Sequence, residues 1–133
     1  NGVRCASHTL QLIVKHSLND ANMEYAIGRI RELIKSIRSH YASCRYLRQA
    51  IKHFCPHLHY QTIPLDVPTR WGSTYTMLAV FLQLLQPVLF LLANNVVELS
   101  MESSGFCPRD IEVAKAFVKT LKPFEDATTF LGG

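Results

Sequence analysis

Residues 27–37 read Ile27-Gly28-Arg29-Ile30-Arg31-Glu32-Leu33-Ile34-Lys35-Ser36-Ile37. Isoleucine recurs in this stretch at steps of three and four residues, which places the four isoleucines on one face of an α-helix. A second stripe on the same helix is basic and consists of Arg31, Lys35 and Arg38. The stretch therefore predicts an amphipathic helix that packs its apolar face against a core and turns a basic stripe elsewhere.

Helical spacing continues on both sides of this stretch. Apolar residues recur at helical steps in residues 6–18 and again in residues 43–54. Residues 77–97 are almost continuously apolar, and we expect them to form a buried helix that is kinked near Pro87. A last helix is expected from residue 109 to about residue 131, bent at a second proline. The chain is thus expected to be mainly α, with about five helices.

Residues 62–67, Thr62-Ile63-Pro64-Leu65-Asp66-Val67, form the only plausible strand. Proline has no N–H to donate to a strand ladder, and Pro64 and Pro68 lie in or beside this segment. We therefore expect at most one short edge strand near residues 62–67.

Length and composition indicate a globular chain that is at most one domain or part of one. It has 133 residues, of which 48% are hydrophobic, and four cysteines without a C-x-x-C pair. We expect reduced thiols, and we expect the chain to be a fragment because it begins without methionine and ends abruptly at Gly132-Gly133. No signal peptide is visible, so the sequence gives no support for secretion. The apolar run 77–97 has the length of a membrane span, but Gln83, Gln86 and Asn94 argue against one, so no membrane partner is expected.

Basic residues are concentrated in the first half of the chain. Residues 1–63 hold nine Lys or Arg and three acids, whereas residues 64–133 hold five and seven. Two successive predicted helices each carry a basic stripe, and such stripes are typical of helices that bind nucleic acid phosphates. A solvated helix surface gives the same pattern. The candidate DNA-binding residues in the two stripes are Arg31, Lys35 and Arg38, followed by Arg45, Arg48 and Lys52.

Two clusters contain residue types that bind zinc. Cys5 and His8 are three residues apart, and Cys55, His57 and His59 follow a C-x-H-x-H pattern. The clusters lie far apart in the sequence, and C-x-H spacing is poor chelating geometry for tetrahedral zinc. We therefore assign no metal site, although the residues alone leave zinc binding open.

The single tryptophan lies in the run Asp66-Val67-Pro68-Thr69-Arg70-Trp71-Gly72-Ser73-Thr74-Tyr75. The hydroxyl of Thr69 or Ser73 is expected to cap a helix that follows. Trp71 beside Arg70 can stack on a base and hold a phosphate. A tryptophan that anchors the core beside a solvated arginine explains the same residues.

Three motifs in order make the chain resemble the hAT family of DNA transposases and their BED-zinc-finger, transposase-derived relatives. The first is the C-x-x-H-x-L-x-L pattern that starts at Cys5 and His8. The second is D-V-x-T-R-W-x-S-T-Y-x-M-L, from Asp66 to Leu78, with Gly72 where asparagine is commoner. The third, at residues 121–128, is similar to L-K-P-F-x-x-A-T.

The resemblance implies an RNase H-like α/β fold of which this chain is a mainly α fragment. Residues 1–75 would belong to the RNase H-like core and residues 76–133 would start a helical insertion. The acidic triad that holds divalent metal (Mg) in active members would lie outside the chain, so the fragment would not be active alone. Asp66 would be a motif residue and not a metal ligand.

The resemblance also implies roles in DNA handling. Trp71 would stabilise a flipped base, Arg70 would hold the neighbouring phosphate, and His8 would lie close to the catalytic centre. The parent protein would be nuclear, would bind DNA and would form homo-oligomers through other regions. It would be either an active cut-and-paste transposase or a domesticated DNA-binding protein that has lost catalysis. The residues alone also leave open a helical protein-interaction domain.

Overall fold

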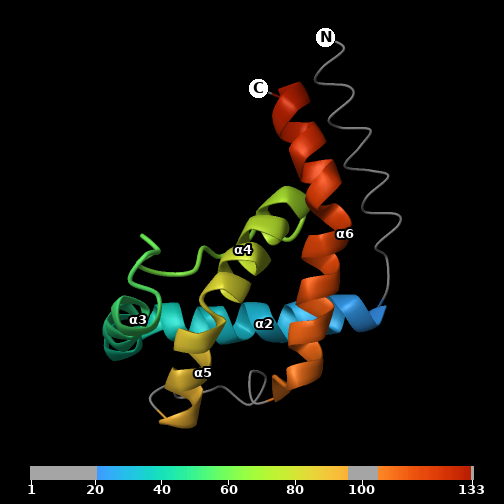
Figure 1. The fold of residues 1–133 in the computed structure, drawn as a ribbon. Coiled ribbons are helices and arrows are strands. Elements are labelled where there is room, and N and C mark those ends of the chain that lie inside the picture. Colours follow the sequence, from blue (N-terminus) through green and yellow to red (C-terminus); the bar gives the residue numbers. More distant parts are fainter. Residues whose placement is uncertain (1–20, 96–104, 133) are drawn as a thin grey trace.

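The computed structural model describes residues 21–95 and 105–132, and these ranges form five helices (Figure 1). The expected mainly α architecture is thereby confirmed. The helix expected over residues 6–18 lies outside the described residues, as do Cys5 and His8. In chain order the helices are α2 (Ala21–Ser39), α3 (Tyr41–Phe54), α4 (Trp71–Gln83), α5 (Leu85–Ala93) and α6 (Pro108–Gly132).

Helix α2 is in close backbone contact with two of the other helices. It packs directly against α3 and α6, while α3 packs against α5 and α4 packs against α6. Figure 1 shows α2 running across the direction of α4 and α6, with α3 at one end. Segments that are distant in the sequence therefore meet along one helix.

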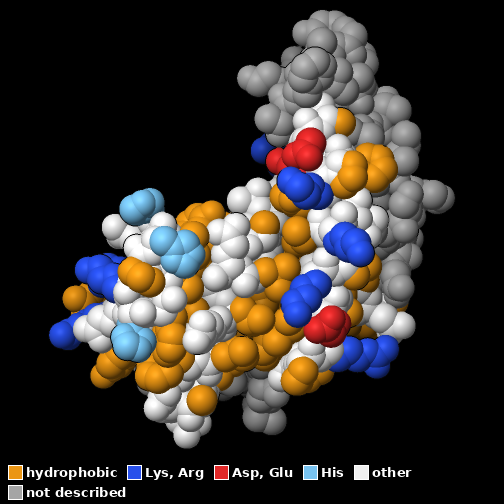
Figure 2. All heavy atoms as spheres, in the orientation of Figure 1, with side chains coloured by type: hydrophobic (Ala, Val, Ile, Leu, Met, Phe, Trp, Pro, Cys, Tyr) orange, Lys and Arg blue, Asp and Glu red, His pale blue; other side chains and the backbone are white. Residues whose placement is uncertain are grey.

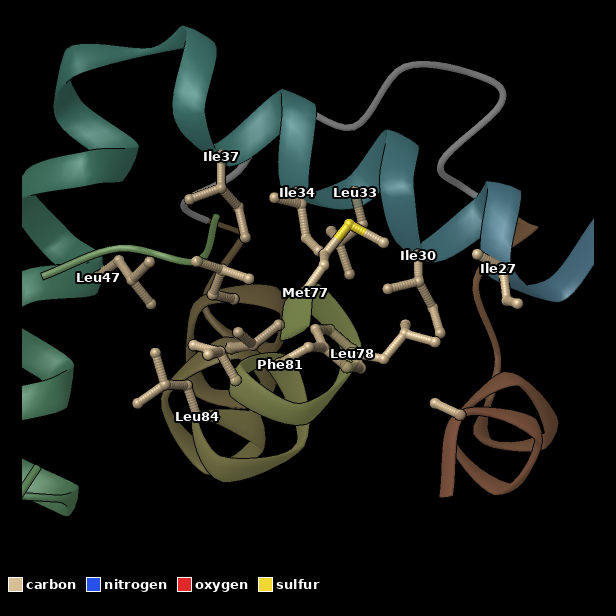
Figure 3. Close-up of a cluster of buried hydrophobic side chains, with 14 of the residues drawn as sticks. Ile27, Ile30, Leu33, Ile34, Ile37, Leu47, Met77, Leu78, Phe81 and Leu84 are labelled. Carbon is tan, nitrogen blue, oxygen red and sulfur yellow. The ribbon is translucent and has the colours of Figure 1, made fainter. Parts of the chain in front are cut away.

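The prediction that the isoleucine face of α2 packs into the core is confirmed. Ile30 and Ile34 are fully buried, and they point toward α4, where Met77, Leu78 and Phe81 are also fully buried (Figure 3). Each large apolar side chain removed from water in this way stabilises the fold by about 1.5–3 kcal/mol. The core thus fixes the position of α4 against the apolar face of α2.

The apolar run that was expected to be one kinked helix is two helices, α4 and α5, which are bent by 67° relative to each other. The break falls at Leu84, three residues before Pro87. In a helix, a proline ring clashes with the carbonyl group four residues earlier and has no N–H to donate to it. For Pro87 this is the carbonyl group of Gln83. The thiol of Cys55 lies 3.9 Å from the Gln83 carbonyl oxygen and donates to it instead.

No single helix in the described ranges is both long and apolar enough to cross a membrane. The pair α4 and α5 reaches that length and composition only jointly, across the 67° bend.

Residues 62–67 do not form a strand, so the expected short strand is wrong. The described part of the chain contains no other strand with which this segment could pair. Its polar groups bind helices instead: Arg38 Nη1 donates to the carbonyl oxygen of Ile63 at 2.8 Å. The two-residue alternation of a strand is also absent, because Ile63 is buried while Leu65 and Val67, two and four residues later, are exposed.

Candidate nucleic-acid interface

Asp66, the first residue of the D-V-x-T-R-W motif, is buried and accepts hydrogen bonds from two helices. Arg31 of α2 donates two hydrogen bonds to it, from Nε to Oδ1 at 2.6 Å and from Nη2 to Oδ2 at 2.8 Å. Thr74 of α4 donates a third from Oγ1 to Oδ2 at 2.5 Å. Paired, planar contacts of this kind are the strongest that arginine makes with a carboxylate. Asp66 thereby joins α2, α4 and the segment before α4.

The protonation of Asp66 follows from these contacts. Burial by itself would raise the pKa of its carboxyl, but the hydrogen bonds from Arg31 and Thr74 and the positive charge of Arg31 outweigh burial and lower it. The same hydrogen bond to Asp66 raises the pKa of Arg31 against the opposing effect of burial. The pair is therefore ionised at neutral pH.

Ser73 holds the turn between Asp66 and α4. The backbone N–H of Val67 donates to Ser73 Oγ at 2.9 Å, and that oxygen lies 2.9 Å from the Val67 carbonyl and 2.8 Å from the Arg70 carbonyl. The Arg70 N–H closes the turn onto the Val67 carbonyl at 2.9 Å. The N-cap residue of α4 is Arg70, without a side-chain cap bond, so the N-cap position is neither Thr69 nor Ser73. Ser73 serves the turn because it lies inside the first turn of α4.

Arg70 and Trp71 point into different environments. Trp71 is 6% exposed and belongs to the core, whereas Arg70 is exposed. Caps are usually small polar residues, and a cation at the positive end of a helix dipole is disfavoured. Within the described ranges Arg70 has no ion-pair partner, although the carboxylate of Glu125 comes close to this end of α4, 3.7 Å from where a Cβ at Gly72 would lie. The DNA contacts of Trp71 and Arg70 stay predictions.

The basic stripe of α2 makes contacts within the chain. Arg31 binds Asp66 and Arg38 binds the Ile63 carbonyl, so both hold the segment before α4. Lys35 is exposed and lies 3.4 Å from Glu32 one turn earlier. Binding of DNA by these three residues stays a prediction, and Lys35 is the one whose side chain is not bound to a distant segment.

The basic stripe of α3 faces solvent. Arg45, Arg48 and Lys52 are all exposed, and none has an ion-pair partner in the described part of the chain. The helix itself contains no acidic residue. Tyr41, one helical turn before Arg45, is 78% exposed. Figure 2 shows Lys, Arg and His side chains gathered at the α3 end of the molecule. This face combines unpaired cations with aromatic rings, the composition of a surface that binds nucleic acid.

A third basic stripe was missed by the sequence analysis. Lys115, Lys119 and Lys122 recur along the exposed side of α6. Acids interrupt it, because Lys115 lies 3.4 Å from Glu112 and Lys122 lies 3.7 Å from Asp126. Figure 2 shows blue side chains along α6 with red side chains before and after them. The stripe is close to electrically neutral and differs in this respect from the stripe of α3.

A second buried carboxylate was also missed. Asp110 is completely buried near the start of α6, and Arg29 donates to it from Nη2 to Oδ1 at 2.7 Å and from Nε to Oδ2 at 2.9 Å. Asp110 also accepts from the backbone N–H of Cys107 at 3.2 Å. An acid in the first turn after Pro108 is a helix-start signal that could have indicated the local contact. No local pattern indicates the pairing with α2.

The described residues do not fit a metal site. They contain no group of three His, Cys, Asp or Glu side chains placed to hold a metal ion. Cys55 is buried against the Gln83 carbonyl while His57 and His59 are exposed. Asp66 and Asp110 are each neutralised by an arginine, so neither is free to hold Mg²⁺. Cys44, Cys55 and Cys107 are free thiols.

Comparison with known proteins agrees with the resemblance seen in the motifs. Residues 3–104 match the family model of the ZBED1 RNase-like helical domain. The chain is 32% identical over 133 residues to the Zea mays protein named "Putative AC transposase", across 98% of this chain and 16% of that protein. The chain thus spans about one sixth of the length of this relative. No solved structure matches it. The chain belongs to the family of the ZBED1 RNase-like helical domain, among the transposase-derived proteins of the hAT group.

Proposed function

We propose that this chain supplies a DNA-contacting surface, and part of the scaffold around the active site, to a larger protein of the transposase family. The observation that carries the proposal is the exposed face of α3, where Arg45, Arg48 and Lys52 have no ion-pair partner in the described residues. Surface cations are commonly balanced by nearby acids, as Lys115 and Lys122 of α6 are. Cations left unbalanced along one helix favour a polyanion, since binding it releases counterions.

The remaining features of the larger protein are part of the same proposal. It would act in the nucleus and form homo-oligomers through other regions. Cut-and-paste chemistry would depend on Mg²⁺ held by residues other than the described ones, because both buried carboxylates here are bound to arginine. A metal ion of this kind activates water or a 3′-hydroxyl and stabilises the leaving oxygen. The described residues would contribute position and charge to that chemistry.

The proposal is tested by DNA binding of the full-length protein. A fluorescein-labelled duplex of mixed sequence is titrated at several salt concentrations, and fluorescence anisotropy reports the affinity. The variant Arg45→Ala/Arg48→Ala/Lys52→Ala is expected to bind about tenfold or more weakly. In a plot of log affinity against log salt concentration, the slope for this variant should be shallower by about 0.9 for each phosphate contact that is lost.

The matched control is Lys115→Ala/Lys119→Ala/Lys122→Ala on α6, which also removes three positive charges. Because acids already pair with two of these three lysines, this variant is expected to bind nearly as well as the wild type. Equal losses in both variants would mean that only the total charge matters. An unchanged salt dependence in the α3 variant would contradict a DNA-contacting face on α3.

A further inference from the structure

We propose that Asp66 is a positioning residue: held by Arg31 and Thr74, it fixes how Arg70 leaves the turn before α4, and with it the DNA contact of Arg70. This inference rests on the proposed function and extends it. It assigns Arg31 the role of supporting a phosphate contact made by another residue. Asp66 and Arg70 are four residues apart and are joined by the turn that Ser73 closes.

The turn is anchored at both ends by buried side chains. Asp66 is 8% exposed at one end and Trp71 is 6% exposed at the other, while residues 68–70 between them are exposed. Thr74 lies one helical turn after Arg70, and its N–H lies 3.3 Å from the Arg70 carbonyl. The hydrogen bond from Thr74 to Asp66 therefore connects the first turn of α4 to the segment before it. A side chain presented from such a fixed turn loses less conformational entropy on binding.

Arg31 is committed to this support. Its Nε and Nη2 both donate to Asp66, and the Asp66 side chain has no exposed surface. If Arg31 turned toward a phosphate, it would leave a buried carboxylate unpaired, which is strongly unfavourable. Arg70 has no such commitment within the described residues. The geometry therefore separates a supporting arginine from a contacting one.

The test uses the sign of the change in affinity. Removing a negative charge near a DNA-binding surface ordinarily strengthens binding to a polyanion. Glu125→Gln, which removes a carboxylate beside Gly72 at the start of α4, is expected to follow that rule. Asp66→Asn also removes one negative charge, but it weakens the hold on the turn. It is expected to lower the affinity of the full-length protein for the labelled duplex about threefold.

A second variant, which removes a single hydrogen bond, allows the same test if Asp66→Asn disturbs folding. Thr74→Val removes only the hydroxyl that donates to Asp66 and leaves the Arg31 pair intact. Its control is Thr76→Val on the same helix, since Thr76 Oγ1 donates to the Gly72 carbonyl and not to Asp66. Thr74→Val is expected to weaken binding, and Thr76→Val is not. Melting temperatures recorded in parallel show whether each variant is folded.

The background variant Arg70→Ala distinguishes positioning from a general effect. With Arg70 removed, Thr74→Val and Asp66→Asn should cause no further loss, because the side chain that they position is gone. A loss that persists in the Arg70→Ala background, or an Asp66→Asn variant that binds more tightly as Glu125→Gln does, overturns the inference. If Arg70→Ala binds normally while the α3 variant binds weakly, the positioning role fails and the proposed function stands. A wild-type protein that does not bind the duplex refutes the proposed function itself.

Discussion

Arg29 and Asp110 lie 81 positions apart in the sequence and meet through two hydrogen bonds of 2.7 and 2.9 Å. The two partners differ in access to water, because the Asp110 side chain has no exposed surface and that of Arg29 is 34% exposed. This pair fastens the start of α6 to α2.

Because the two side chains differ in exposure, we expect replacement of Arg29 and replacement of Asp110 to destabilise the fold by different amounts. Arg29→Met leaves a buried carboxylate that cannot reach water, and we expect a loss of about 3–5 kcal/mol in the free energy of unfolding. Asp110→Asn leaves an arginine that can turn toward solvent, and we expect a loss of about 1–2 kcal/mol. Urea denaturation of the full-length protein measures the two losses of stability. Hydrogen exchange in α6 shows whether they arise at this helix. Equal losses would contradict the asymmetry.

The lowered pKa of Asp66 predicts a specific pH dependence of stability. A carboxyl whose pKa is lower in the folded than in the unfolded protein stabilises the fold above its ordinary value of 3.8, and this contribution is lost as pH falls below that value. The difference in unfolding free energy between wild type and Asp66→Asn should therefore be largest near neutral pH and should shrink below pH ~4.

Glu125 provides a control of opposite sign. Burial, followed by the nearby charge of Asp126, raises its pKa above 4.5, so ionisation of Glu125 destabilises the fold as pH rises through that range. Glu125→Gln should consequently increase stability at neutral pH and change it little in acid. Thermal unfolding of both variants between acid and neutral pH would show whether the two curves diverge in these directions.

Trp71 is expected to behave as a core residue in stability measurements. Its ring is buried together with Met77 and Leu78, so Trp71→Ala should cost about 3–5 kcal/mol, and Trp71→Phe should cost clearly less. Chemical denaturation of the full-length protein gives both values. A Trp71→Ala variant that is as stable as the wild type but binds DNA weakly would instead support base stacking by an exposed ring.

The cations on α3 are expected to contribute almost nothing to stability. Arg45, Arg48 and Lys52 are exposed and have no partner in the described residues, and alanine is the better helix former. The variant with all three replaced by alanine should therefore unfold within about 0.5 kcal/mol per substitution of the wild type. A large drop in its melting temperature would show that these side chains support the fold and would remove the basis for assigning them to DNA.

The helices were predictable from the sequence because their signals are local. The isoleucines of α2 recur at helical steps and are buried, and α6 runs from Pro108 to Gly132, where residues 109 to about 131 were expected. The break at Leu84 was displaced from the expected position near Pro87, since a proline acts on the carbonyl four residues before it. The strand expected at residues 62–67 could not be judged locally, because a strand depends on a neighbour elsewhere in the chain.

The contacts of the candidate site were mostly beyond local reasoning. Arg31 and Lys52 both belong to basic stripes with helical spacing, yet Arg31 is paired with a buried aspartate 35 positions away and Lys52 faces solvent. Helical spacing shows which residues share a face, but not what lies opposite that face. The role of Thr74 follows from the same tertiary arrangement, because only the folded chain brings it to Asp66.

The position of two arginines on α2 also bears on how the length of this chain can vary among relatives. Arg29 and Arg31 bind carboxylates from two different parts of the chain, while the isoleucines between and around them face the core. Inserting or deleting one residue in α2 would rotate everything beyond it by about 100° and would separate the arginines from the apolar face they accompany. Substitutions in α2 should therefore be tolerated far better than changes of length. Insertions and deletions should accumulate in residues 56–61, whose side chains are mostly exposed.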